Sequence, residues 1–224
     1  SLGLLWSRSS APTGITKMKV NFREIFMKKV LVLLQPEDVG MSARDFLSMY
    51  ASYITDVGMV AKRPNGHTVY RSKTAPVEST HNQFFEDWVQ LASALNINSV
   101  AGMDFYTDGW FARDPKYQTM TSKGKAMTHQ ICPNREEFWQ YGAEIVRELG
   151  SYPINEIFLF GIGYTRDHYC FCERCRKEFA PKVGQEPHRL TYEFISENPD
   201  HHTLWQRWRA DKVAQGLAYL RDAA

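Results

Sequence analysis

The chain has 224 residues, of which 43% are hydrophobic, and its 27 basic and 25 acidic residues give a formal net charge of +2. That length suits one substantial core, so we expect a single domain. The nearly balanced charge gives no electrostatic support for binding nucleic acid or an anionic membrane. No apolar run approaches the roughly 20 residues that a membrane-spanning helix needs, so we expect neither nucleic acid nor a membrane as a partner.

The first stretch of the chain is expected to lie outside the fold. Residues 1–16 are predicted to form a disordered leader, and residues 17–224 the domain. The apolar patch of the leader is too short for the hydrophobic region of a signal peptide, and it lacks the basic segment that would precede one. We therefore expect a cytoplasmic protein, in which cysteines stay reduced.

The domain begins with a predicted strand and helix. Residues 29–35, KVLVLLQ, form a continuous apolar run that is typical of a buried parallel strand. A helix is expected over residues 43–57, capped by Ser42 and closed by Gly58. Residues 59–81 have no clear period and are predicted to form a long loop with a short hairpin at residues 65–66.

Basic side chains gather in this first long loop. The default interpretation of such a cluster is a solvated face, although it also suits an anionic group. The residues concerned are Lys62, Arg63, Arg71 and Lys73.

Further helices alternate with strands downstream. Helices are predicted at residues 84–95, 138–149 and 204–223, and strands at residues 97–106 and 154–164. Asn134 is expected to cap the middle helix, with Glu137 reaching back. Residues 107–131 form a second long loop. Buried strands that alternate with helices indicate an α/β fold with a parallel sheet, of the (β/α) TIM-barrel type.

Four cysteines, the only ones in the chain, make the densest chemical feature of the sequence. Cys170, Cys172 and Cys175 lie in a CxCxxC turn, YCFCERC, and Cys132 lies upstream. Thiolates are soft ligands, and four of them match tetrahedral zinc. Because four thiolates leave no position open to water, we predict a structural zinc rather than a catalytic one.

Disulfides, free thiols and an iron or redox centre remain open as alternatives. Cys170 and Cys172 are too close for an easy mutual bridge, and three cysteines within six residues suit a metal better than two defined bridges. In a reducing compartment, a cysteine cluster is typical of a metal-binding or catalytic site.

The order of these features resembles that of glycoside hydrolase family 42 β-galactosidases, and of the broader set of uncharacterised glycosidase-like TIM barrels that share the cluster. A lone Cys132, a helix and a strand precede the CxCxxC turn, which leads into a helix containing Phe179. The resemblance is strongest over residues 97–180. It implies a glycoside hydrolase-like protein in which four cysteines hold a structural zinc beside the active site.

The chain departs from the family pattern in its carboxylates. The family has an Asn-Glu pair at the end of the fourth strand, and its Glu is the general acid/base. Residues 160–164 read FGIGY here and carry no carboxylate. Retaining glycosidases need two carboxyl groups about 5 Å apart. The nearest acids are Asp104 and Asp167, which become the candidate catalytic residues, although a structural hydrogen bond for Asp104 and a surface pair with Arg166 for Asp167 are the alternatives.

The chain also departs from the family in length. A closed (β/α)₈ barrel needs about 250 residues, and the late strand that bears the family's nucleophile is missing. We therefore expect an incomplete or half barrel. The exposed sheet edges of a half barrel favour pairing, which makes a homo-oligomer a hypothesis with a physical motive.

Four residues near the second long loop are candidates for substrate binding: Tyr106, Asp108, Trp110 and His129. Tyr106 and Trp110 offer rings that suit a sugar, although core packing is the alternative. Asp108 precedes a glycine, which is also typical of a turn. His129 lies three residues before Cys132, so it is an alternative ligand, a partner of a thiolate, or a loop histidine without a role.

These features favour a glycoside hydrolase-like protein with a structural zinc that acts on or binds carbohydrate. A non-catalytic, zinc-stabilised (β/α) module or assembly subunit that lost its catalytic carboxylates is the alternative. A thiol redox or iron protein is a third hypothesis.

Overall fold

The computed structural model of the protein describes residues 31–79 and 83–224, so the predicted leader lies outside the described residues. A four-stranded parallel sheet forms its centre, in the order β1-β2-β3-β6. The strands are β1 (Leu31–Leu34), β2 (Asp56–Lys62), β3 (Asn98–Asp104) and β6 (Glu156–Phe160). Strands and helices alternate along the chain, which confirms the predicted α/β class. Within the described ranges the sheet stays open and forms no closed barrel.

Helices and one hairpin complete the described structure. The α-helices are α2 (Pro36–Val39), α3 (Ala43–Tyr50), α4 (Phe84–Ala94), α5 (Glu136–Leu149), α6 (Glu173–Phe179), α7 (Tyr192–Ser196) and α8 (Pro199–Arg221). Short 3-10 turns are η1 (Phe111–Arg113), η2 (Pro115–Tyr117), η3 (Ala180–Val183) and η4 (Pro187–Arg189). An antiparallel hairpin joins β4 (Gln118–Met120) to β5 (Ala126–Ile131). No helix in the described ranges is both long and apolar enough to cross a bilayer.

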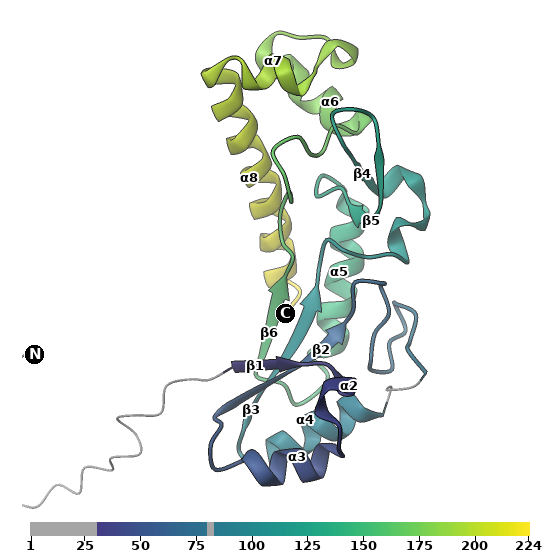
Figure 1. Cartoon of the computed structure of the whole chain (residues 1–224), viewed down its shortest axis with the longest axis vertical. Helices are drawn as coiled ribbons and strands as arrows, with labels where there is room; N and C mark the ends of the chain where they lie inside the picture. The colour runs from purple at the N-terminus through teal and green to yellow at the C-terminus, as the bar shows by residue number, and fades with distance from the viewer. Residues whose placement is uncertain (1–30, 80–82) are drawn as a thin grey trace, which may run out of the picture.

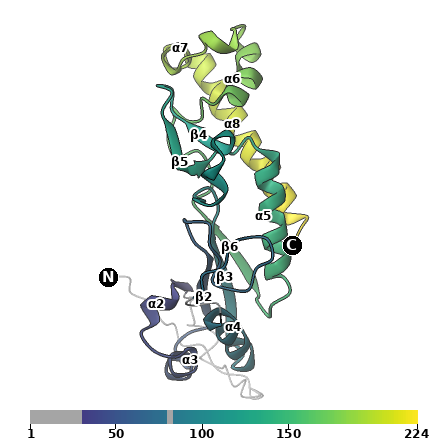
Figure 2. The same ribbon diagram turned by 90° about the vertical axis from the view of Figure 1, so that its right-hand side faces the viewer.

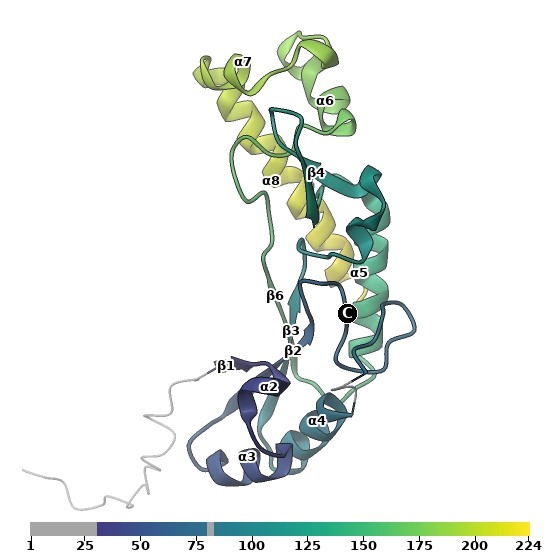
Figure 3. The same cartoon turned by 45° about the vertical axis from the view of Figure 1, so that its right-hand side comes forward.

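The molecule is elongated, with the sheet, α3 and α4 at one end and α6 and α7 at the other (Figure 1). The long helix α8 runs from the α7 end back towards the sheet and lies beside α5 (Figure 2). The β4–β5 hairpin lies between the two ends (Figure 3). The strand ends that carry polar residues therefore point towards the half of the molecule that holds the cysteines.

The structure corrects the predicted helix over residues 43–57 and the long loop after it. Helix α3 ends at Tyr50, and β2 occupies part of both predicted segments. Every residue of β2 is buried, including Gly58, which was predicted to end a helix. A central parallel strand is buried on both faces, so its apolar residues do not alternate with polar ones. Val57 of this strand also fits the helical spacing of the preceding apolar residues, which extended the predicted helix too far. The predicted hairpin at residues 65–66 is confirmed by an antiparallel bridge between Lys62 and Thr68.

The structure also corrects the second predicted loop. Residues 107–131 contain η1, η2 and the β4–β5 hairpin. Strands this short, most of whose residues are exposed or partly exposed, carry little hydrophobic period. The hairpin is nonetheless tied to the rest of the chain, because the backbone N–H of Phe171 donates to the carbonyl of Met120 at 2.7 Å.

Two separate apolar cores hold the molecule together. The larger one lies between the sheet and α3, α4 and α5, and includes Met59, Trp88 and Ile145. The smaller one surrounds the cysteines with aromatic side chains from α6 and α8, including Phe179 and Trp205. Each core is rich in large buried side chains, and truncating such a side chain typically lowers the stability of a protein by several kilocalories per mole.

Helix α8 belongs to both cores. Trp205, near its start, lies in the smaller core, and Leu220, near its end, lies in the larger one. Its close approach to α5 depends on Gly216, since a Cβ there would fall 1.9 Å from the ring of Trp139. The missing side chain of Gly216 thus sets the contact between these two helices.

Candidate functional site

Three segments bring the four cysteines together. Cys132 directly follows β5, and its backbone N–H donates to the carbonyl of Tyr117 at 2.8 Å. Cys170 follows the long segment that leaves β6. Cys172 is the N-cap residue of α6, and Cys175 lies in the first turn of that helix. The hairpin, the segment after β6 and α6 therefore meet at one point.

The geometry of the cluster fits a tetrahedral metal. All four side chains are buried free thiols, and their Sγ atoms lie within 4.8 Å of one another. The Sγ of Cys132 lies 3.4 Å from that of Cys175 and 3.7 Å from that of Cys172. Four sulfurs bound to zinc at about 2.3 Å lie about 3.8 Å apart, so the sulfurs are spaced as zinc ligands would be.

Hydrogen-bond donors surround the sulfurs. The backbone N–H groups of Met120 and Cys172 donate to the Sγ of Cys170 at 3.2 Å and 3.4 Å. The side-chain amide of Asn134 donates to the Sγ of Cys175 at 3.9 Å. This corrects the predicted cap, because Arg135 is the N-cap residue of α5 and Asn134 faces the cluster. Donors of this kind orient thiolate ligands.

The sulfurs perturb one another's ionisation. Hydrogen bonds from the neighbouring thiols lower the pKa of Cys172, whereas hydrogen bonds to the other sulfurs raise the pKa of Cys132 and of Cys175. Four buried thiolates at this spacing repel one another, so their joint ionisation needs a bound cation. The donor set therefore suits a soft divalent metal and leaves no position free for water.

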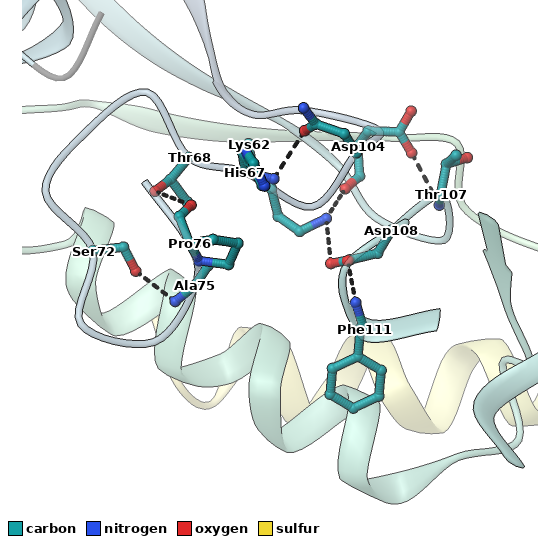
Figure 4. A network of polar contacts seen from close by, with 11 residues as sticks. Lys62, His67, Thr68, Ser72, Ala75, Pro76, Asp104, Thr107, Asp108 and Phe111 are labelled. Carbon is teal, nitrogen blue, oxygen red and sulfur yellow. Dashed lines mark hydrogen bonds and ion pairs between the residues drawn. The ribbon is translucent and has the colours of Figure 1, made fainter. Parts of the chain in front are cut away.

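A second polar cluster lies at the carboxyl end of the sheet (Figure 4). Lys62, the last residue of β2, is buried, and its Nζ donates to the backbone oxygen of Asp104 at 2.8 Å. The same Nζ lies 3.0 Å from Oδ2 of Asp108. Burial lowers the pKa of Lys62, and the charge and hydrogen bond of Asp108 oppose that effect. The predicted solvated face is thus wrong for Lys62.

Asp104 occupies the end of β3, beside Phe160 at the end of β6. Its Oδ1 accepts a hydrogen bond from the backbone N–H of Thr107 at 3.2 Å, and the residue is 9% exposed. Burial raises the pKa of Asp104, while the Thr107 hydrogen bond and the charge of Lys62 oppose that rise. An acid that keeps its proton more readily than usual is suited to protonate a leaving group.

Asp108 has a different environment, with no exposed surface. Besides Lys62, it binds the backbone N–H of Phe111, which donates to Oδ1 at 2.7 Å. The turn at Gly66 closes over it, since a Cβ on Gly66, whose φ is +89°, would lie 2.2 Å from Oδ1 of Asp108. In this conformation Asp108 holds the loop and presents no atom to a substrate, which corrects its expected role in substrate binding.

The other three candidates for substrate binding, Tyr106, Trp110 and His129, differ in their burial and do not form one site. Tyr106 is 3% exposed and packs against Phe105 and Trp139, so its ring offers no open face for a sugar. Trp110 is half-buried, with its ring 5.7 Å from that of Tyr141. His129 is exposed on β5 and is not part of the group of metal-ligating side chains.

Asp167 lies in the segment after β6 and contacts α8. Its side chain is 57% exposed, accepts a hydrogen bond from Gln206 at 2.7 Å and lies 3.5 Å from Arg209. Asp104, in contrast, interacts with residues of β2 and of the loop after β3. The two acids predicted to be catalytic therefore have no partner in common.

Sequence reasoning named Lys62 as part of a basic loop but did not predict its burial at the end of a strand. A signal was present, because Lys62 ends the run DVGMVAK, whose apolar residues are buried in β2. Had that run been identified as a strand, its last residue would have been expected at the same edge of the sheet as Asp104, since parallel strands end together.

Comparisons with known proteins support the fold. No protein-family model and no curated protein matches this sequence. Among solved structures, α-L-fucosidase isoenzyme 2 from Paenibacillus thiaminolyticus has a TM-score of 0.66 and 20% identity over 88% of this chain and 30% of that one. The catalytic domain of β-amylase from Paenibacillus polymyxa has a TM-score of 0.60 and 9% identity over 88% of this chain and 62% of that one.

A third neighbour is a β-galactosidase from the haloarchaeon Halorubrum lacusprofundi, with a TM-score of 0.52 and 17% identity over 70% of this chain and 25% of that one. The chain thus spans less than two thirds of the length of each of these three enzymes. At such identities the likeness concerns the fold alone. The chain has a glycosidase-like α/β fold, with a parallel sheet of the kind found in TIM-barrel glycosidases.

Proposed function

We propose that the protein is a glycoside hydrolase-like module that acts on or binds a carbohydrate at the carboxyl end of its sheet, beside a structural zinc. The observation that carries the proposal is Asp104, a largely buried acid with a raised pKa at the end of β3. In barrel enzymes this edge of the sheet carries the active site. The fold supports the proposal, since glycosidases share it.

In this proposal Asp104 donates a proton to the glycosidic oxygen as the bond to the sugar breaks. A second carboxylate must stabilise the sugar or activate water. Asp108 is fully buried and held by Lys62, and Asp167 contacts α8, so neither carboxylate is available for that task. The proposal therefore assigns this second role to neither of these two acids.

For the metal, we propose zinc bound by Cys132, Cys170, Cys172 and Cys175. The spacing of their sulfurs and the N–H donors around them support this assignment. Such an ion supplies cross-linking rather than catalysis, because four thiolates leave it no open position.

Replacing Asp104 by Asn tests the catalytic role. We expect hydrolysis of aryl fucosides, galactosides and glucosides to fall by at least about 100-fold, the usual contribution of a general acid. Asp211→Asn, which changes an exposed acid on α8, is the matched control and should leave turnover unchanged. Unchanged turnover in a folded Asp104→Asn protein would remove Asp104 from the mechanism.

Native mass spectrometry with and without a chelator tests the metal. We expect one zinc for each chain, lost together with the fold of the smaller core when the chelator is present. A metal-free chain with a visible absorbance band or reversible thiol oxidation would instead support an iron or redox protein.

A non-catalytic module or assembly subunit is the second candidate, and one observation favours it. Phe158 on β6, the last strand of the described sheet, is 45% exposed and stacks against Phe160. An open edge with an exposed aromatic ring suits pairing with another chain, including a second copy. Carbohydrate binding without turnover, or a symmetric oligomer in the same mass spectra, would favour this candidate.

A further inference from the structure

A small cavity lies at the carboxyl end of the sheet, between the segment after β3 and the segment after β6. Its volume is about 10 Å³, and its lining includes Tyr106, Thr107, Thr119, Gln130, Tyr164 and Thr165. Ile131 and Pro133 also line it, so it lies directly beside Cys132. The cavity therefore lies between residues that follow β3 and residues that flank Cys132.

Two tyrosine hydroxyls of the lining lack hydrogen-bond partners within the described part of the chain. They belong to Tyr106 and Tyr164, and both oxygens are fully buried. The Tyr106 ring is fixed by Phe105 and Trp139, with centroids 5.3 Å and 5.6 Å away. The Tyr164 ring is covered by the guanidinium of Arg209, 4.3 Å from its centroid. Neither ring is free to turn its hydroxyl to solvent.

Both hydroxyls keep their protons. Burial raises the pKa of Tyr106 and of Tyr164. A neutral phenol donates one hydrogen bond and accepts others. A buried hydroxyl without a partner is unfavourable, and two tyrosines with such hydroxyls line the same cavity, which indicates a shared ligand with both donor and acceptor capacity.

We propose that this cavity binds a single ordered water that hydrogen-bonds to the hydroxyls of Tyr106 and Tyr164. The volume equals the space that one water needs, and buried waters sit where two or more polar groups converge. Threonine and glutamine side chains of the lining supply further polar groups. The water links the segment after β3 to the segment that leads into the CxCxxC turn.

A crystal structure of the full chain at a resolution that shows ordered solvent tests the proposal. We expect one water about 2.7–2.8 Å from both hydroxyl oxygens. Tyr106→Phe and Tyr164→Phe should each weaken its density, and the double variant should remove it. Tyr141→Phe is the matched control, since this largely buried tyrosine on α5 interacts with Asp108 and does not line the cavity.

Two crystallographic results would overturn the proposal. One is an empty cavity in which both hydroxyls bond directly to protein groups. The other is a water that persists unchanged in the double variant, because the hydroxyls would then not hold it.

Solution NMR of the unaltered protein covers the case in which the variants do not fold. With labelled tyrosine, the two hydroxyl protons should exchange slowly with solvent and show magnetisation transfer from a long-lived water. Fast exchange of both protons would contradict the proposal as well.

Discussion

The two polar clusters of this protein use their charges in opposite ways. In the cysteine cluster, four side chains of one kind face a common centre, and their thiolate forms would repel one another unless a cation bound between them. In the strand-end cluster, the cation is part of the chain, because Lys62 already neutralises Asp108 and holds the backbone of Asp104. The first arrangement suits a bound cation, whereas in the second the chain itself supplies the positive charge.

Removing one sulfur should have the largest effect. Cys175→Ser takes one proposed ligand from the buried cluster, and structural zinc contributes on the order of 10 kcal/mol to small zinc-binding folds. We expect the smaller core, with Trp205 and Trp208, to lose its fixed packing while the parallel sheet remains. Near-ultraviolet circular dichroism and tryptophan fluorescence report this loss. A chelator should produce the same change in the unaltered protein and none in the variant, and an unaffected variant would mean that the cluster does not depend on metal.

Breaking the internal ion pair should cost less, but still several kilocalories per mole. Lys62→Met leaves Asp108 charged and buried without its partner, which typically costs about 3–5 kcal/mol. The double variant Lys62→Met/Asp108→Asn removes the unpaired charge and should recover most of the loss. Urea unfolding of the single and double variants measures both quantities. If the double variant is no more stable than Lys62→Met, the strand-end cluster is not held together by this pair.

Crowding the contact between α5 and α8 should have an intermediate effect on stability. Gly216→Ala places a methyl group against the ring of Trp139, and overpacking of this kind costs about 1–3 kcal/mol. Gln215→Ala changes an exposed neighbour on α8 and is the matched control. Thermal unfolding should show a lower midpoint for Gly216→Ala alone. Equal midpoints would indicate that α5 and α8 separate at little cost.

The smallest effect concerns pH. Because burial raises the pKa of Asp104, the native state holds a proton that the unfolded state has already lost, so this group lowers stability as pH rises through its unfolded value of 3.8 towards its native value. Asp104→Asn cannot titrate and should therefore lose less stability than the unaltered protein between pH 3.5 and 7, values that bracket the ordinary Asp pKa of about 3.9. The difference between their unfolding free energies across that range is the measurement. A difference that runs the other way would mean that Lys62 dominates the ionisation of Asp104.

The sequence predicted the site best where several reactive side chains lie close together in the chain. Four cysteines with a CxCxxC spacing predict one cluster wherever the segments lie, and the structure brings their sulfurs together. Asp104 was expected at the end of a buried strand, and β3 does end there. The parallel α/β class was also predicted, because three short and strongly apolar runs that alternate with helices are typical of strands in a buried parallel sheet.

Other features depend on contacts between distant segments. Lys62 is buried only because β2 lies between β1 and β3, and that strand was hidden by a coincidence of spacing at Val57. Asn134 was expected to cap a helix, but the sulfur of Cys175 lies within its reach and Arg135 became the N-cap residue. Short strands such as β4 are stabilised by their partners rather than by their own period.

Helix α8, which contributes Trp205 to one core and Leu220 to the other, has a consequence for local unfolding. Two cores that shared no element would open independently, each with its own free energy. Here the amides of α8 are protected by both, so loss of the proposed zinc should expose the start of the helix to hydrogen exchange first and leave its final turns, packed near α5, protected longest. The position along α8 at which amides begin to exchange would thus show which of the two cores has unfolded.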